Sequence, residues 1–286
     1  MSKRLRKAVF PVAGLGTRLL PATKSIPKEM LTVVDRPLIQ YAVDEAREAG
    51  IEQLIFVTGR GKASLVDYFD MAFELETVMN ENGKSLEILS ASRANYGEVI
   101  SVRQQAPLGL GHAVWCARHI VGDEPFAVLL ADDLMEGKPG ALKQMVDAWE
   151  AVGGNLIATE EVPADKTSSY GIISPGDTKG GLTEVRGLVE KPDPAAAPSR
   201  LGVVGRYILQ PEVMTVLDSG ERGAGGEIQL TDAMAQLIGK QPFHALKVDA
   251  VRHDCGDRAG FVIANLAMAL DRNDVAPKVR DYLKSV

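Results

Sequence analysis

The stretch Val12-Ala13-Gly14-Leu15-Gly16-Thr17-Arg18-Leu19 decides the fold of this chain, because it joins an apolar run at residues 8–12 to a glycine turn. Such a junction is typical of a first strand that enters a β-α-β unit. Gly14 and Gly16 can adopt positive φ and let a ligand approach the main chain closely. The turn also brings backbone N–H groups and Arg18 toward one point, which suits a phosphate. A plain strand-to-helix connection would show the same glycines, and the spacing matches neither the P-loop nor the dinucleotide fingerprint.

Short apolar runs recur through the first half of the chain with helix-like segments between them. We expect strands at residues 8–12, 54–58, 86–91, 99–103 and 126–131. Residues 37–49 carry alanines and Leu38 on one face and charged side chains elsewhere, the pattern of a helix that covers a sheet. The alternation predicts an α/β fold: a single Rossmann-like, three-layer domain whose central sheet is mixed and mainly parallel.

The second half is richer in β structure. We expect strands at residues 155–162, 171–174, 182–190 and 202–209, joined by short Gly and Pro turns. A mobile loop rich in Pro and Ala is expected at 192–199, and helices at 230–238 and 259–270, the latter beginning after Asp257 as its N-cap. These strands would extend the first sheet and form a second wall of the ligand cleft.

Composition and charge argue against several classes of protein. The 286 residues carry a net charge of −6, which argues against a broad nucleic-acid surface. No apolar stretch approaches the roughly 18–20 residues of a membrane span. The two cysteines, Cys116 and Cys255, and the four histidines show no disulfide framework or zinc spacing. We expect a protein of the reducing cytoplasm that binds neither nucleic acid nor membrane.

A pair of carboxylates, Asp132 and Asp133, ends the apolar run 126–131. In an open α/β sheet, ligands bind beyond the carboxyl ends of the strands, so this pair should face the same cleft as the glycine turn. Hard carboxylate oxygens beside a phosphate cradle favour Mg²⁺. A strand-end Asp is more often a turn former or helix cap, and the phosphate cradle is what favours the metal here.

Several motifs together resemble the sugar-1-phosphate nucleotidylyltransferases, and the resemblance runs nearly end to end. It rests on Gly14-Leu15-Gly16-Thr17-Arg18-Leu19-Leu20-Pro21-Ala22-Thr23, Pro27-Lys28-Glu29-Met30-Leu31, Gln104 with Gly109-Leu110-Gly111-His112-Ala113, and Glu190-Lys191-Pro192. Within this family the chain is most similar to the bacterial uridylyltransferases that act on glucose 1-phosphate. Thr32 departs from the commoner proline and puts no catalytic residue in doubt.

The resemblance implies a reaction and a set of nucleotide-side roles. UTP and glucose 1-phosphate would give UDP-glucose and pyrophosphate with Mg²⁺ as cofactor, and the subunits would form a homodimer or homotetramer. Residues 1–150 would mainly bind the nucleotide, and residues 151–286 would mainly bind the sugar phosphate and supply the C-terminal helices. The implied nucleotide-binding residues are Ala13, Gly14, Gly16, Thr17, Gln104 and Gly109, with Gln104 rather than Gln105 reading the pyrimidine. Apart from the resemblance, His112 is a lone histidine at a helix start, and we expect it to be a structural hydrogen-bond donor rather than a catalyst.

The catalytic and sugar-side roles also come from the resemblance. The catalytic cations would be Arg18, Lys28 and Lys191, and Asp132 would hold the metal, with Asp254 as a second ligand unless phosphate oxygens and water take its place. The sugar-phosphate side would consist of Asp133, Gly171, Glu190, Lys191 and Val204. An adjacent Glu and Lys are usually only a solvated surface pair, and the motif favours the functional reading here. Two alternatives remain: an enzyme that prefers dTTP, and a silent regulatory subunit that only binds nucleotide.

Overall fold

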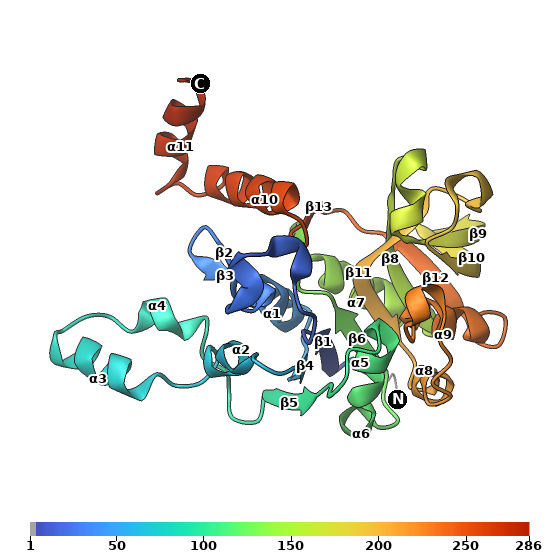
Figure 1. The fold of residues 1–286 in the computed structure, drawn as a ribbon, viewed down its shortest axis with the longest axis horizontal. Helices are drawn as coiled ribbons and strands as arrows, with labels where there is room; N and C mark the ends of the chain where they lie inside the picture. The colour runs from blue at the N-terminus through green and yellow to red at the C-terminus, as the bar shows by residue number, and fades with distance from the viewer. Residues whose placement is uncertain (1–3, 286) are drawn as a thin grey trace.

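The fold is built on one mixed sheet that runs through the molecule (Figure 1), seen in a computed structural model that describes residues 4–285. Within those residues nine strands pair in the order β5 (Val99–Arg103), β4 (Gln53–Thr58), β1 (Lys7–Pro11), β6 (Phe126–Leu129), β11 (Leu201–Leu209), β8 (Asn155–Glu161), β12 (Phe243–Lys247), β10 (Leu182–Glu190) and β9 (Gly171–Lys179). Two small ribbons accompany it: β2 (Thr32–Val33) with β3 (Arg36–Pro37), and β7 (Asp133–Glu136) with β13 (Val251–Asp254).

Helices cover both faces of this sheet, which gives the three layers expected from the sequence. Strand β1 shows why, since successive side chains point to opposite faces. Ala8 and Phe10 pack with α1 (Leu38–Glu48) and α7 (Ala141–Val152). Val9 packs on the other side, in the core formed with α5 (Leu110–Cys116), α8 (Glu212–Leu217) and α9 (Leu230–Leu237).

The remaining helices lie at the ends of the molecule or in connections. They are α2 (Ala63–Asp67), α3 (Phe73–Glu81), α4 (Glu87–Ser90), α6 (Arg118–Val121), α10 (Arg258–Leu270) and α11 (Ala276–Leu283). Short 3₁₀ turns occur at Thr17–Leu19, Ala22–Lys24, Lys28–Met30, Ala164–Ser169, Pro194–Ala196 and Ala224–Gly226. Figure 1 shows that α3 with α4, and α10 with α11, project from the body of the sheet. Across residues 4–285, no helix has both the length and the apolar character needed to cross a bilayer.

Most sequence expectations agree with these bounds to within one or two residues, but three differ. Residues 86–91 are not a strand: they form α4, in an excursion that places no neighbouring strand beside them. The expected strand 171–174 continues to Lys179, because β10 supplies a partner along its length. The compact fold also does not end with α10, since α11 follows it.

The sheet is mixed, although its parallel part is smaller than the sequence suggested. β5, β4, β1 and β6 run parallel, as do β8 and β12. β11 runs antiparallel to both β6 and β8, and β10 runs antiparallel to both β12 and β9. The second half therefore extends the first sheet as expected, but it does so mainly through antiparallel pairs.

Candidate active site

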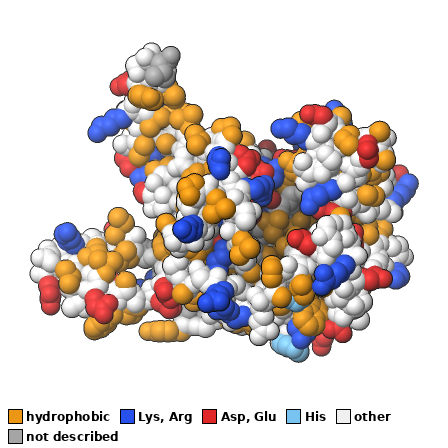
Figure 2. All heavy atoms as spheres, in the orientation of Figure 1, with side chains coloured by type: hydrophobic (Ala, Val, Ile, Leu, Met, Phe, Trp, Pro, Cys, Tyr) orange, Lys and Arg blue, Asp and Glu red, His pale blue; other side chains and the backbone are white. Residues whose placement is uncertain are grey.

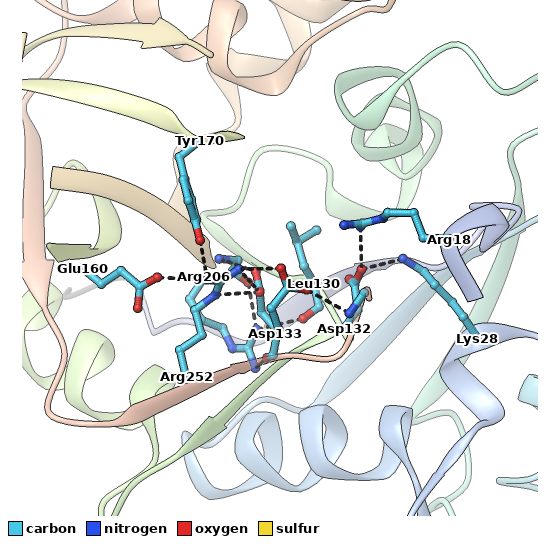
Figure 3. A network of polar contacts seen from close by, with 12 residues as sticks. Arg18, Lys28, Leu130, Asp132, Asp133, Glu160, Tyr170, Arg206 and Arg252 are labelled. Carbon is cyan, nitrogen blue, oxygen red and sulfur yellow. Dashed lines mark hydrogen bonds and ion pairs between the residues drawn. The ribbon is translucent and has the colours of Figure 1, made fainter. Parts of the chain in front are cut away.

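The glycine turn and the carboxylate pair lie together because they follow adjacent parallel strands. β1 pairs with β6, so their carboxyl ends open at the same edge of the sheet. Contacts join the two segments: Lys28 Nζ lies 2.6 Å from Asp132 Oδ2, and Arg18 Nη2 lies 3.9 Å from the same oxygen. The convergence predicted from the sequence is therefore present, and Figure 3 shows both cations directed at Asp132.

A cavity of about 330 Å³ lies on the side of the glycine turn. Every residue that the sequence assigned to the nucleotide lines it: Ala13, Gly14, Gly16, Thr17, Gln104 and Gly109. Glu227 also lines this cavity, and it comes from the second half of the chain. The wall of the cavity is therefore drawn from both halves.

The glycine turn is shaped to offer its main chain to a ligand. Gly16 has φ 67°, and a Cβ there would lie 3.1 Å from the Thr23 side chain and 3.2 Å from Cβ of Lys28. Among residues 4–285, no acceptor takes a hydrogen bond from the N–H groups of residues 13–16. Four donors in a turn are thus available to phosphate oxygens.

Gly109 is required on the opposite wall for steric reasons. Its φ is 112°, and a Cβ would lie 2.7 Å from the carbonyl oxygen of Ile228 and 2.8 Å from Cβ of Glu227. A side chain at this position would push the segment that contains Glu227 away from the cavity. The close approach of the Glu227 segment to this wall of the cavity therefore requires glycine at position 109.

A second cavity, of about 550 Å³, adjoins the first on the sugar side expected from the sequence. Leu110 lines both cavities. Seven of the residues expected to bind the metal or the sugar phosphate, or to act in catalysis, line this second cavity: Arg18, Asp132, Asp133, Gly171, Glu190, Lys191 and Asp254. Figure 2 shows this face of the molecule hollowed between the C-terminal helices and the part that contains β9 and β10. Lys28 lines neither cavity and reaches the site through its contact with Asp132.

Val204 is a second expected site residue that lines neither cavity. Its side chain is 1 % exposed and packs in the core beneath α1 and α7. Its neighbours Val203 and Gly205 line the sugar-side cavity instead. Because side chains alternate along a strand, only every second residue of β11 can face the ligand. The sequence motif alone did not fix which ones do.

Asp132 is held ionised by the cations around it. Burial alone would raise the pKa of this carboxyl, but the Lys28 ammonium, a backbone hydrogen bond and the Arg18 charge together outweigh burial and lower the pKa below its usual range. Burial likewise tends to lower the pKa of Lys28, and Asp132 and Glu29 more than offset it, so that the pKa of Lys28 is raised. The pair therefore remains charged near neutral pH.

Asp133 differs from Asp132 in its partners. Its Oδ1 accepts a hydrogen bond from Arg252 Nε at 2.7 Å, and its Oδ2 accepts from the N–H of Gly205 at 3.0 Å. Burial raises the pKa of Asp133 despite the nearby Arg252 guanidinium. Both carboxylate oxygens are thus already engaged with the protein, which makes this side chain a poor candidate for the metal.

Arg252 is a site residue that the sequence reasoning missed. Besides Asp133, it contacts Glu160 at 2.9 Å and the Tyr170 hydroxyl at 3.1 Å, as seen in Figure 3. It lies on β13, which pairs with β7 so that Asp254 stands opposite Asp133. Its place directly before the His253-Asp254 segment was the available signal.

Two carboxylates could hold a divalent cation here. A Cβ at Gly256 would lie 2.9 Å from Asp254 Oδ1, 3.1 Å from Asp132 Oδ2 and 2.6 Å from Arg18 Nη2, so the two carboxylates and Arg18 converge on this glycine, and a side chain there would push them apart. Lys28 already places a positive charge on Asp132. Within residues 4–285 no cluster of three His, Cys, Asp or Glu side chains suited to a metal occurs. The residues therefore fit an ion that takes its other ligands from phosphate and water.

Lys191 has a backbone conformation that is uncommon for its residue type. Its φ is 46°, in the left-handed region, and its Nζ lies 3.2 Å from Glu190 Oε1. Left-handed backbone at a non-glycine residue costs about 1–3 kcal/mol and clusters at functional sites. Gly171 lies beside the same pair, since a Cβ there would be 3.3 Å from Glu190 Oε2. Asp193 caps the following 3₁₀ turn.

The segment from Glu227 to Thr231, which leads into α9, is a further part of the site and comes from the second half of the chain. Gln229 and Thr231 line the sugar-side cavity, and Glu227 lines the nucleotide side. This segment therefore contributes to the walls of both cavities.

Comparison with known proteins agrees with this geometry. The family model described as nucleotidyl transferase matches residues 7–269. A UTP–glucose-1-phosphate uridylyltransferase of Komagataeibacter xylinus is 54 % identical over 260 residues, which cover 90 % of this chain and 92 % of that protein. The solved structure of UTP-bound UGPase from Acinetobacter baumannii is 43 % identical, with a TM-score of 0.89 and 99 % of each chain covered. A UDP-glucose pyrophosphorylase complexed with UDP-glucose is 41 % identical, with a TM-score of 0.84, and covers 94 % of this chain and 100 % of its own.

The chain belongs to the nucleotidyl transferase family. Its high identity over nearly the full length of both chains places it, within that family, among the UTP–glucose-1-phosphate uridylyltransferases.

Proposed function

We propose that this protein transfers the uridylyl group of UTP to α-D-glucose 1-phosphate and releases pyrophosphate, by direct displacement at the α-phosphorus. The observation that carries the proposal is the junction of the two cavities. They share Leu110, and Arg18 and Asp132 line the second cavity, where Lys28 also contacts Asp132. A nucleotide and a sugar phosphate bound side by side would meet at this charged point.

The attacking phosphate oxygen is already an anion, so the reaction needs positioning and charge neutralisation rather than a strong base. The N–H groups of residues 13–16 would bind phosphate oxygens of the nucleotide, and Arg18 would stabilise the leaving pyrophosphate. Lys28 would neutralise charge beside Asp132, and Lys191 would bind the phosphate of the sugar substrate.

Asp132 and Asp254, which converge beside Gly256, would hold Mg²⁺, and the ion would supply neutralisation of phosphate charge. Asp132 would be the principal ligand, because its carboxylate is the point on which Arg18 and Lys28 converge at the edge of the sugar-side cavity. Asp254 Oδ1 also accepts a hydrogen bond from the N–H of Gly256, which orients the carboxylate.

On the sugar side, Asp133, Gly171 and Glu190 would contact the hexose, assisted by Gln229 and Thr231 from the second half of the chain. We propose that residues 1–150 mainly bind the nucleotide and that residues 151–286 mainly bind the sugar phosphate. Glu227 is an exception, since it lies on the nucleotide side. The relatives named for UTP and UDP-glucose support this assignment of ligands.

We also propose that the protein forms a homodimer or homotetramer and that it acts in the cytoplasm. Large apolar side chains are exposed on two projecting elements: Phe73, Leu75 and Val78 on α3, and Val262 and Ile263 on α10. Burial of such side chains against another subunit would be favourable. A cytoplasmic location accords with a nucleoside triphosphate substrate and with cysteines that are not joined to each other.

The test is pyrophosphate release by the purified protein in the presence of Mg²⁺. UTP with glucose 1-phosphate should support turnover, and each substrate alone should not. Initial rates with dTTP in place of UTP distinguish a uridylyltransferase from a thymidylyltransferase. Binding of UTP without any release of pyrophosphate would instead favour a silent regulatory subunit.

A further inference from the structure

The amide of Gln104 is held in one orientation by two partners. Its Nε2 lies 3.0 Å from the carbonyl oxygen of Gly109 and 3.0 Å from Nδ1 of His112. A carbonyl oxygen can only accept, so the amide nitrogen must be the atom that faces Gly109. Reversing the amide would set two carbonyl oxygens against each other.

These two contacts use both hydrogens of the amide, because one points to Gly109 and the other to His112. The Oε1 atom accepts no hydrogen bond from any residue between 4 and 285, and Gln104 lines the nucleotide-side cavity. A ligand in that cavity therefore meets Gln104 as a hydrogen-bond acceptor.

His112 can accept from the amide only in the neutral ring with its proton on Nε2, and its surroundings favour the neutral ring. The imidazole stacks on Trp115 at a centroid distance of 5.7 Å, and the Arg118 guanidinium lies 3.5 Å from the Trp115 ring centroid. Burial and the charge of Arg118 lower the pKa of His112. The other titratable neighbour is the Cys116 thiol, with Sγ 4.0 Å from Nδ1, and burial raises the pKa of Cys116.

We propose that His112 is a positioning residue for base selection: by accepting from the Gln104 amide, it keeps the Gln104 carbonyl oxygen directed at the base, so that the site selects a pyrimidine with a ring N–H. Uracil has such a donor at N3, whereas N3 of cytosine is an acceptor. Cytosine would place its N3 lone pair against Gln104 Oε1 and leave both acceptors without a donor. This inference rests on the proposed function, because it takes UTP as the nucleotide of this site.

The test measures equilibrium binding of UTP and of CTP by calorimetry, together with turnover on each. His112→Leu removes the acceptor and lets the amide rotate, so the preference for UTP over CTP should fall by about tenfold or more. His112→Asn restores an acceptor close to the position of Nδ1 and should recover most of the preference. His119→Leu is the matched control, because His119 is exposed on α6, and it should keep the preference of the unaltered protein.

A second measurement needs no variant. UTP methylated at N3 lacks the donor, and the unaltered protein should bind it at least about tenfold more weakly than UTP. An unchanged UTP-to-CTP ratio in folded His112→Leu would overturn the inference, as would equal losses of the ratio in the Leu and Asn variants. Equal binding of UTP and its N3-methyl derivative would also overturn it. Selective UTP binding without turnover would instead count against the proposed function and leave the role of His112 standing.

Discussion

Substitution of Arg206 tests what holds the backbone around Asp132 and Asp133 in place. Its side chain is 1 % exposed, and it donates to both oxygens of Glu45, from Nε at 2.9 and 3.1 Å and from Nη2 at 2.7 Å. The guanidinium also donates to the carbonyl oxygens of Leu130, Gly205 and Asp133 at 2.9–3.0 Å. Two of these carbonyls flank Asp132, so Arg206 fixes the backbone from which that carboxylate projects (Figure 3).

Arg206→Met replaces this side chain with an apolar one of similar length. It leaves the Glu45 carboxylate buried without its cation, and removing one partner of a buried ion pair costs about 3–5 kcal/mol. The three carbonyls also lose a donor, so we expect the free energy of unfolding to fall by at least that amount. Urea unfolding followed by circular dichroism measures the change.

Two further variants separate the contribution of the Arg206–Glu45 ion pair from other effects on stability. Arg206→Met with Glu45→Met removes both charges, and the loss should be smaller than the sum of the single losses by about 2 kcal/mol or more. Glu45 also accepts from the N–H of Leu142 at 2.9 Å, so the double variant should still be less stable than the unaltered protein. Arg200→Met removes an exposed partner of Glu161 and should cost less than about 0.5–1 kcal/mol. A cost below about 1 kcal/mol for Arg206→Met, or additive losses in the double variant, would refute this reasoning.

The other predictions concern the chemistry of the site. Asp132→Asn removes the anion beside Lys28 and should lower turnover by about 10²- to 10³-fold, with weaker dependence on added Mg²⁺. Asp133→Asn should instead alter the use of glucose 1-phosphate and keep the Mg²⁺ requirement. Turnover measured against Mg²⁺ concentration compares the two variants. Gln104→Ala should weaken UTP use by roughly 10- to 100-fold in kcat/KM, and Gln105→Ala, at an exposed position outside the cavity, should change it little; equal losses would show that the register of the motif is wrong. Lys191→Ala should raise KM for glucose 1-phosphate about tenfold and leave the calorimetric affinity for UTP intact, and the reverse pattern would contradict its assignment to the sugar phosphate.

Local sequence patterns determined much of the scaffold. Apolar runs with intervening amphipathic segments predicted β1, β4, β5 and β6 to within two residues, because strand and helix periodicity are local properties. The meeting of the glycine turn with Asp132 was predictable too. Adjacent parallel strands open their carboxyl ends at one edge, whatever the rest of the fold does.

Other features depended on partners distant in the sequence. Residues 86–91 form an apolar run whose periodicity fits either a strand or a helix, and it became α4 because the excursion places no strand beside it. The side of β11 on which Val204 lies was fixed by packing against the core, and a shift of one residue would have reversed it. No local signal could supply either result.

The sequence by itself determined the residue types at the centre of the site: the glycines of the turn, the cations Arg18 and Lys28, and the carboxylate Asp132. Only the tertiary structure decided what surrounds them. Arg252 reaches Asp133 because β13 pairs with β7, more than a hundred residues away. Such contacts depend on where distant backbone segments lie in space, and the free energy that fixes those positions comes from the packing of the whole core rather than from neighbours in sequence.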